Sequence, residues 1–98
     1  MAKTIYNGNL AGSTDAVHMP VKAFQNCYVK AHPANTGNVY IGSSSDVVAS
    51  GTTDTNTTGG FVLDASEIFL PGAPGDLSDY WYICDNATDT LCYYVENF

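Results

Sequence analysis

The apolar residues of this chain occur in short runs that alternate with polar residues, and clusters of Gly, Pro, Ser, Thr, Asn and Asp close each run. Alternation places successive side chains on opposite faces of a β-strand. No stretch repeats apolar residues every three to four positions, as an amphipathic helix would. Seven or eight short strands at intervals of about 8–12 residues are typical of an all-β sandwich or barrel. We therefore predict an antiparallel β-sandwich, jelly-roll-like, with little or no helix.

The clearest predicted strand spans residues 24–32, where Cys27, Val29 and Ala31 share one face. A turn rich in Pro, Asn and Gly separates it from a strand at 39–42, which we expect to be its hairpin partner. Shorter strands are expected at residues 16–20, 46–49, 61–64, 66–70, 79–84 and 91–96.

The chain is short, and its few charges are unevenly placed. Its 98 residues are enough for one domain, which we expect over residues 21–98, with an N-terminal arm or extended segment over 1–20. Charged residues make up only 13%, and three Lys, no Arg and ten acids give a net charge of −7. Residues 1–30 carry a net +2, whereas residues 31–98 hold nine acids and no Lys or Arg. Nucleic-acid binding needs clustered Lys and Arg, so nucleic acid is not expected as a partner.

Residue parity in the last two predicted strands, taken as a hairpin, separates a core face from a second face. If Ile83 faces the core, Trp81 does too, and Leu91, Tyr93 and Val95 form the matching set on the partner strand. Tyrosine combines a large contact area with a polar tip and is enriched at interfaces. The second face is then either an interface or covered by the other sheet of the sandwich. Its aromatic and sulfur-containing residues are Tyr80, Tyr82, Tyr94, Cys84 and Cys92.

Motifs for catalysis, metal binding and membrane insertion are missing from the sequence. His18 and His32 lack a second ligand at metal-binding spacing. Asp76 and Asp79 have the spacing for an acid and base pair, but a chain of this size hardly forms the cleft that such a pair needs. There is no nucleophile motif, no apolar run for a bilayer and no signal segment. We expect no catalytic residue, metal, cofactor or membrane contact, no secretion, and no enzymatic activity.

The cysteines number three, which argues against an obligatory disulfide scaffold. Cys84 and Cys92 agree in parity, so they could face each other across the last hairpin and bond in an oxidising medium. We expect Cys27 to be a small buried apolar residue.

Four segments resemble a family of small virion proteins of tailed bacteriophages. The resemblance runs from Val29 to the C-terminus, and the chain departs from the family's pattern in a Thr-rich stretch at 50–60 and in Cys84 and Cys92. The matching segments are A-H-P-A-N-T-G-N-V-Y-I-G at 31–42, G-F-V-L-D-A-S-E-I-F-L-P at 60–71, D-L-S-D-Y-W-Y-I at 76–83 and L-C-Y-Y-V-E at 91–96.

This resemblance implies a compact β-sandwich on the virion and carries over no catalytic residue. We expect a capsid decoration (cement) protein, assembled in the host cytoplasm, that binds the major capsid protein on the outside of the shell and stabilises it. Many copies on a lattice gain strength through avidity, and a closed homotrimer suits three-fold positions. The alternative is a receptor- or carbohydrate-binding module of a head or tail fibre.

The candidate contact residues come from two parts of the chain. The slightly positive N-terminal part is expected to touch the shell, while the acidic remainder faces solvent and keeps particles apart. The candidates are Lys3, Tyr6 and Met19 in the N-terminal segment and Tyr80, Tyr82 and Tyr94 in the tyrosine row.

Overall fold

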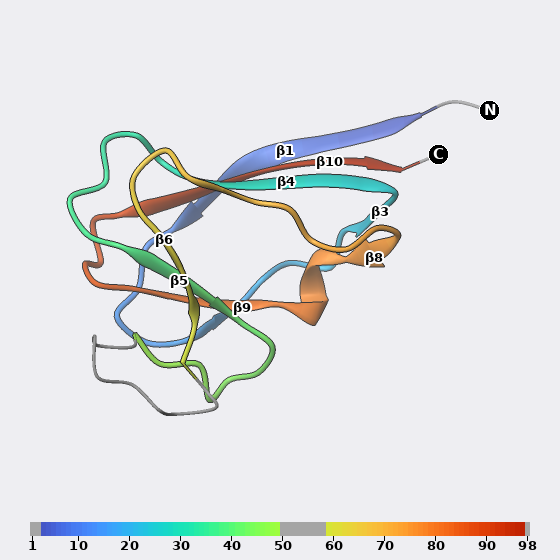
Figure 1. Cartoon of the computed structure of the whole chain (residues 1–98). Helices are drawn as coiled ribbons and strands as arrows, with labels where there is room; N and C mark the ends of the chain where they lie inside the picture. The colour runs from blue at the N-terminus through green and yellow to red at the C-terminus, as the bar shows by residue number, and fades with distance from the viewer. Residues whose placement is uncertain (1–2, 50–58, 98) are drawn as a thin grey trace.

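A computed structural model gives the structure of this protein and describes residues 3–49 and 59–97. Within those ranges the fold is all-β, and the one helical element is a short 3-10 turn, η1, at Leu77–Asp79. Two four-stranded sheets lie one above the other (Figure 1), and every pairing between their strands is antiparallel. The prediction of an antiparallel all-β sandwich is confirmed.

Each sheet combines strands that are far apart in the sequence. The first sheet has the order β1 (Thr4–Ala11), β10 (Thr90–Asn97), β4 (Asn26–Ala31) and β7 (Ile68–Phe69). The second has the order β2 (Val17–His18), β9 (Trp81–Cys84), β5 (Val39–Gly42) and β6 (Phe61–Leu63). A small third sheet pairs β3 (Ala23–Phe24) with β8 (Gly75–Asp76).

The core lies between the two larger sheets. On β4 the residues expected to share one face are all buried, with Cys27 at 5% exposure and both Val29 and Ala31 at 0%. Their register partners on β10 include Leu91 and Val95, which are also fully buried. The inward parity of these two strands is therefore confirmed.

The expected hairpin between residues 24–32 and 39–42 is wrong, because β4 and β5 lie in different sheets. The connecting loop crosses from one sheet to the other and is held by two carboxylates. Asp89 accepts hydrogen bonds from the backbone N–H groups of Thr36 and Gly37, at 3.1 and 3.2 Å. Asp85 accepts one from the N–H of Asn38, at 2.9 Å. The hairpin was predicted because the two strands are close in the sequence. Instead, these hydrogen bonds hold the loop as a crossover from the first sheet to the second.

The last two strands are not a hairpin either, and the parity predicted for β9 is inverted. β9 pairs with β2 and β5, whereas β10 pairs with β1 and β4. Tyr82 and Cys84 are buried at 2% exposure, and Trp81 and Ile83 are only partly buried. Tyr82 can face the core because its hydroxyl donates to the carbonyl of Ala11 at 2.7 Å.

The N-terminal segment is extended but does not form a separate arm. Residues 4–11 form β1, which pairs along its whole length with β10. Met19 is 2% exposed and belongs to the core. Of the strand expected at 46–49, Val48 makes a single bridge to Gly59.

The inverted parity of β9 can be tested by two neighbouring truncations. Tyr82→Ala should lower the free energy of unfolding by about 3–5 kcal/mol, because it empties a core site. Trp81→Ala should cost only about 1 kcal/mol, since Trp81 stacks on His18 at 4.4 Å on the outside of the sheet. Urea unfolding of both variants measures the difference. A larger loss for Trp81→Ala than for Tyr82→Ala would contradict the arrangement.

Candidate functional site

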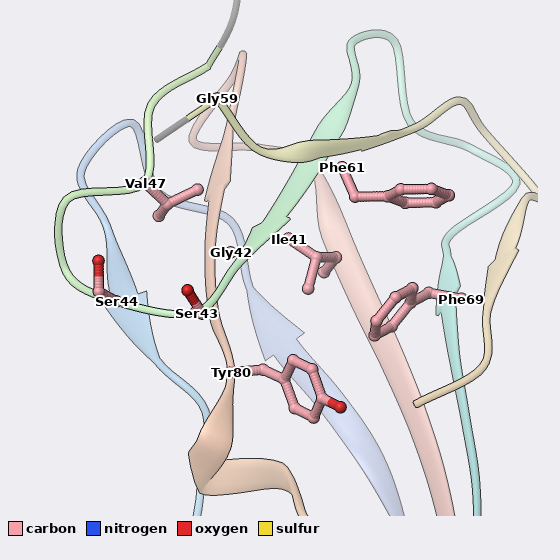
Figure 2. A pocket seen from close by; sticks show the side chains of 9 residues that line it. All are labelled: Ile41, Gly42, Ser43, Ser44, Val47, Gly59, Phe61, Phe69 and Tyr80. Carbon is pink, nitrogen blue, oxygen red and sulfur yellow. The ribbon is translucent and has the colours of Figure 1, made fainter. Parts of the chain in front are cut away.

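A cleft of about 310 Å³ opens where the edge of one sheet meets the edge of the other. Its walls come from β5 and the loop after it, from β6, from β7 and from the residue that precedes β9. None of its lining residues is charged. They are Ile41, Gly42, Ser43, Ser44, Val47, Gly59, Phe61, Phe69 and Tyr80 (Figure 2).

Three aromatic rings form one side of this cleft. The ring centroids of Phe61 and Phe69 lie 5.6 Å apart, and those of Phe69 and Tyr80 lie 5.5 Å apart in an edge-on arrangement. Phe61 is 60% exposed although it belongs to a strand. Figure 2 shows the side chains of Ser43 and Ser44 across the cleft from Phe61 and Phe69. The cleft thus offers an apolar wall and a hydroxyl-bearing wall to a neutral group.

The outer surface of the first sheet forms a second candidate site, which we call the outer tyrosine face. Tyr28 and Tyr94 are direct register partners, with ring centroids 6.3 Å apart and exposures of 49% and 37%. Ile5 and Ile68 lie on the same face of the sheet, because their register partners Glu96 and Lys30 alternate with the buried residues of β10 and β4. Exposed aromatic and aliphatic groups of this kind mark interaction surfaces.

The outer tyrosine face is almost free of net charge. The four strands of its sheet contain two charged residues, Lys30 and Glu96. Glu96 accepts hydrogen bonds from Tyr94 at 3.0 Å, from Lys3 at 3.2 Å and from Asn26 at 3.2 Å. The bond from the Tyr94 hydroxyl, followed by that from Lys3, lowers the pKa of the Glu96 carboxyl. The one positive and one negative charge of these strands cancel, although the chain as a whole has a net charge of −7.

The predicted row of tyrosines does not exist, because its members lie in three different parts of the molecule. Tyr82 is in the core, Tyr80 lines the cleft, and Tyr94 lies on the outer tyrosine face. The row depended on a hairpin between β9 and β10, which the two sheets separate.

The N-terminal candidates are also separated. Lys3 makes an ion pair with Glu96 at the end of β1. Tyr6 is 42% exposed, and its ring lies 4.3 Å from the ammonium of Lys22. Since its register partner Val95 is buried, Tyr6 faces away from the outer tyrosine face. Met19 is buried and so cannot be a contact residue.

All three cysteines are free thiols, so the structure contains no bond between Cys84 and Cys92. Cys84 faces the core from the second sheet, whereas Cys92 is partly buried on the outer side of the first. Burial raises the pKa of the Cys27 thiol to about 12 and also raises the pKa of Cys84.

Three of the residues considered for catalysis and metal binding, His18, His32 and Asp76, have structural partners. His18 stacks on Trp81, and Nδ1 of His32 accepts the N–H of Ala34 at 3.0 Å. Asp76 accepts the N–H groups of Ser78 and Lys22, at 2.9 and 3.0 Å, and the bond from Ser78 is the main cause of its lowered pKa. The described residues contain no group of three or more His, Cys, Asp and Glu placed to hold a metal. In residues 3–49 and 59–97 there is also no helix long and apolar enough to cross a bilayer.

Comparison with known protein families, with curated proteins and with solved structures finds no match to this chain. The resemblance to phage virion proteins therefore stays a prediction from the sequence.

The cysteines give a test of the core that does not depend on function. Cys92 should react with iodoacetamide in the native protein, while Cys27 and Cys84 react only after unfolding, because a buried protonated thiol is a poor nucleophile. Mass mapping of labelled peptides, before and after urea and without reductant, measures this order. Rapid native labelling of Cys27 would contradict its placement, and persistent protection of both Cys84 and Cys92 in urea would reveal a disulfide.

Proposed function

We propose that this protein is a non-catalytic structural protein of a phage virion, a decoration protein that binds the outside of the capsid shell and stabilises it. The observation that carries the proposal is the outer tyrosine face, defined by Ile5, Tyr28, Ile68 and Tyr94. Each of these side chains is more than a third exposed. The phage resemblance of residues 29–98 supplies the identity of the partner as the major capsid protein.

The chemistry of this face favours docking onto a protein surface. Tyrosine is enriched among the residues that dominate binding energy at interfaces, and it retains a polar tip when exposed. Lys3 adds a positive charge at the end of β1, where it pairs with Glu96. A face with an aromatic centre and little net charge can approach a neutral or acidic shell, which a surface typical of a −7 chain would repel.

The two tyrosines provide the direct test. Tyr28→Ser/Tyr94→Ser should weaken binding to undecorated capsids of the encoding phage by about tenfold or more, because it removes the aromatic centre of the contact. Co-sedimentation with capsids measures the bound fraction. Phe61→Ser is the matched control, since it removes an exposed aromatic from the opposite sheet and should leave binding unchanged. A wild-type chain that never sediments with capsids, or equal binding by the double variant, would overturn the proposal.

The uncharged cleft favours a second candidate function, the binding of a neutral sugar by a fibre module. A pyranose ring has an apolar face and a rim of hydroxyls, which match the aromatic wall and the Ser43 and Ser44 wall. The volume lies at the lower end of the range of small-ligand sites, about 300–1,000 Å³.

The sugar hypothesis is tested at Phe61, the most exposed of the three rings in the aromatic wall. A neutral glycan that binds in an array should lose about tenfold or more of its affinity with Phe61→Ala and keep its affinity with Tyr28→Ser/Tyr94→Ser. Absence of any binding by the wild-type chain to neutral glycans, or equal binding by Phe61→Ala, would exclude the cleft as a sugar site.

A further inference from the structure

The edge of the first sheet at β1 is long and unprotected, unlike the other edges. The four-stranded sheets end in β1 and β7 and in β2 and β6. β7, β2 and β6 are two or three residues long, whereas β1 has eight residues. Short strands, prolines and charges are the usual devices that keep sheet edges from pairing with other chains. β1 contains no proline and no charged residue.

The free side of β1 has backbone groups available to another strand, apart from the carbonyl of Ala11, which accepts the hydroxyl of Tyr82. β10 is the only element that packs extensively alongside β1 in the described part of the chain, and Figure 1 shows β1 at the margin of its sheet. In an antiparallel strand with one neighbour, alternate N–H and C=O groups point away from that neighbour. Lys3, the charged residue adjacent to β1 in the sequence, is engaged with Glu96 on β10, and the ammonium of Lys22 lies over the ring of Tyr6. An extended strand can therefore add to this edge.

The sequence of β1 indicates that the strand which adds to this edge is β1 of a second copy of the chain. Residues 5–11 read I-Y-N-G-N-L-A, which is symmetric in chemical class about Gly8. A contact across a two-fold axis must be self-complementary, and this symmetry supplies that property. We propose that two copies join through antiparallel pairing of β1 with β1, centred on Gly8, to form one continuous eight-stranded sheet.

Each cross-strand pair in this register joins residues of the same kind. Ile5 lies opposite Ala11 of the second copy, Tyr6 opposite Leu10, and Asn7 opposite Asn9. Moving the axis by one residue to Asn7 would instead place Ile5 opposite Asn9, an apolar residue against an amide. Directly opposed side chains are the pairs that stabilise a sheet. A Cβ at Gly8 would lie 3.1 to 3.3 Å from the side chain of Tyr93, a tight approach within the same chain, so the flanking pairs carry the argument.

Charge variants at Asn7 and Asn9 test both the contact and its register. Both side chains are exposed, and they oppose each other across the proposed axis. Asn7→Lys/Asn9→Lys sets like charges against each other and should weaken self-association by about tenfold or more. Asn7→Lys/Asn9→Glu sets opposite charges against each other and should restore it. Val62→Lys/Ala34→Lys adds the same charge at two exposed sites outside β1, one of them on β6 in the other sheet, and is the control.

Sedimentation velocity over a range of concentrations measures the mass, with 10.4 kDa expected for one chain. The proposal expects a dimer for the wild type, the control and the Lys/Glu variant, and a monomer for the Lys/Lys variant at matched concentration. A wild-type monomer at every concentration, a trimer, or a dimer unaffected by the Lys/Lys change would overturn it. Loss of the dimer in the Lys/Glu variant would overturn the register. Far-ultraviolet circular dichroism of each variant shows that its fold is retained.

Discussion

The structure depends on β10, the strand that pairs along its length with two others. β10 pairs with β1 along one edge and with β4 along the other. The first strand, the last strand and the strand at 26–31 therefore belong to one sheet. Leu91 and Val95 point from it into the core and are fully buried. The second sheet packs on the apolar layer that β10 and β4 present. Contacts between residues this far apart in sequence are costly to close, and burial of a common core is what offsets that cost.

Most of the strands could be predicted from the sequence, but their partners could not, and β1 was expected only as an arm or extended segment. Alternation is local, so Cys27, Val29 and Ala31 were assignable to one face without knowledge of the fold. Strand pairing depends on the path of the connecting loops. The loop from β4 to β5 and the loop from β9 to β10 both cross between the sheets, and hydrogen bonds to Asp85 and Asp89 join them. For the same reason the cleft was not predictable, because Phe61, Phe69 and Tyr80 come from two sheets. The outer tyrosine face could be predicted in part from the sequence, since Tyr28 alternates with the buried residues of β4.

The acidic composition has a structural explanation beyond repulsion between particles. Asp76, Asp85 and Asp89 each accept at least one backbone N–H from a loop that is distant in sequence. Glu67 accepts the N–H of Asp64 in the turn before β7. A carboxylate can accept several such bonds, and bonds to a charged acceptor are stronger than those between neutral groups. Short loops of Ser, Thr, Asn and Gly thereby gain fixed conformations, and lysine, a donor without acceptor capacity, cannot do this.

The proposed β1 contact and the proposed capsid contact reinforce each other through symmetry. A two-fold axis perpendicular to the first sheet keeps the outer surfaces of both copies on the same side. The two outer tyrosine faces then form one surface, with Tyr28 and Tyr94 present twice. Once one copy has docked, attachment of the second is intramolecular and gains from a high effective concentration. A shell that presents matching sites at that spacing would hold the pair far more tightly than a single copy, with no contact added to either face.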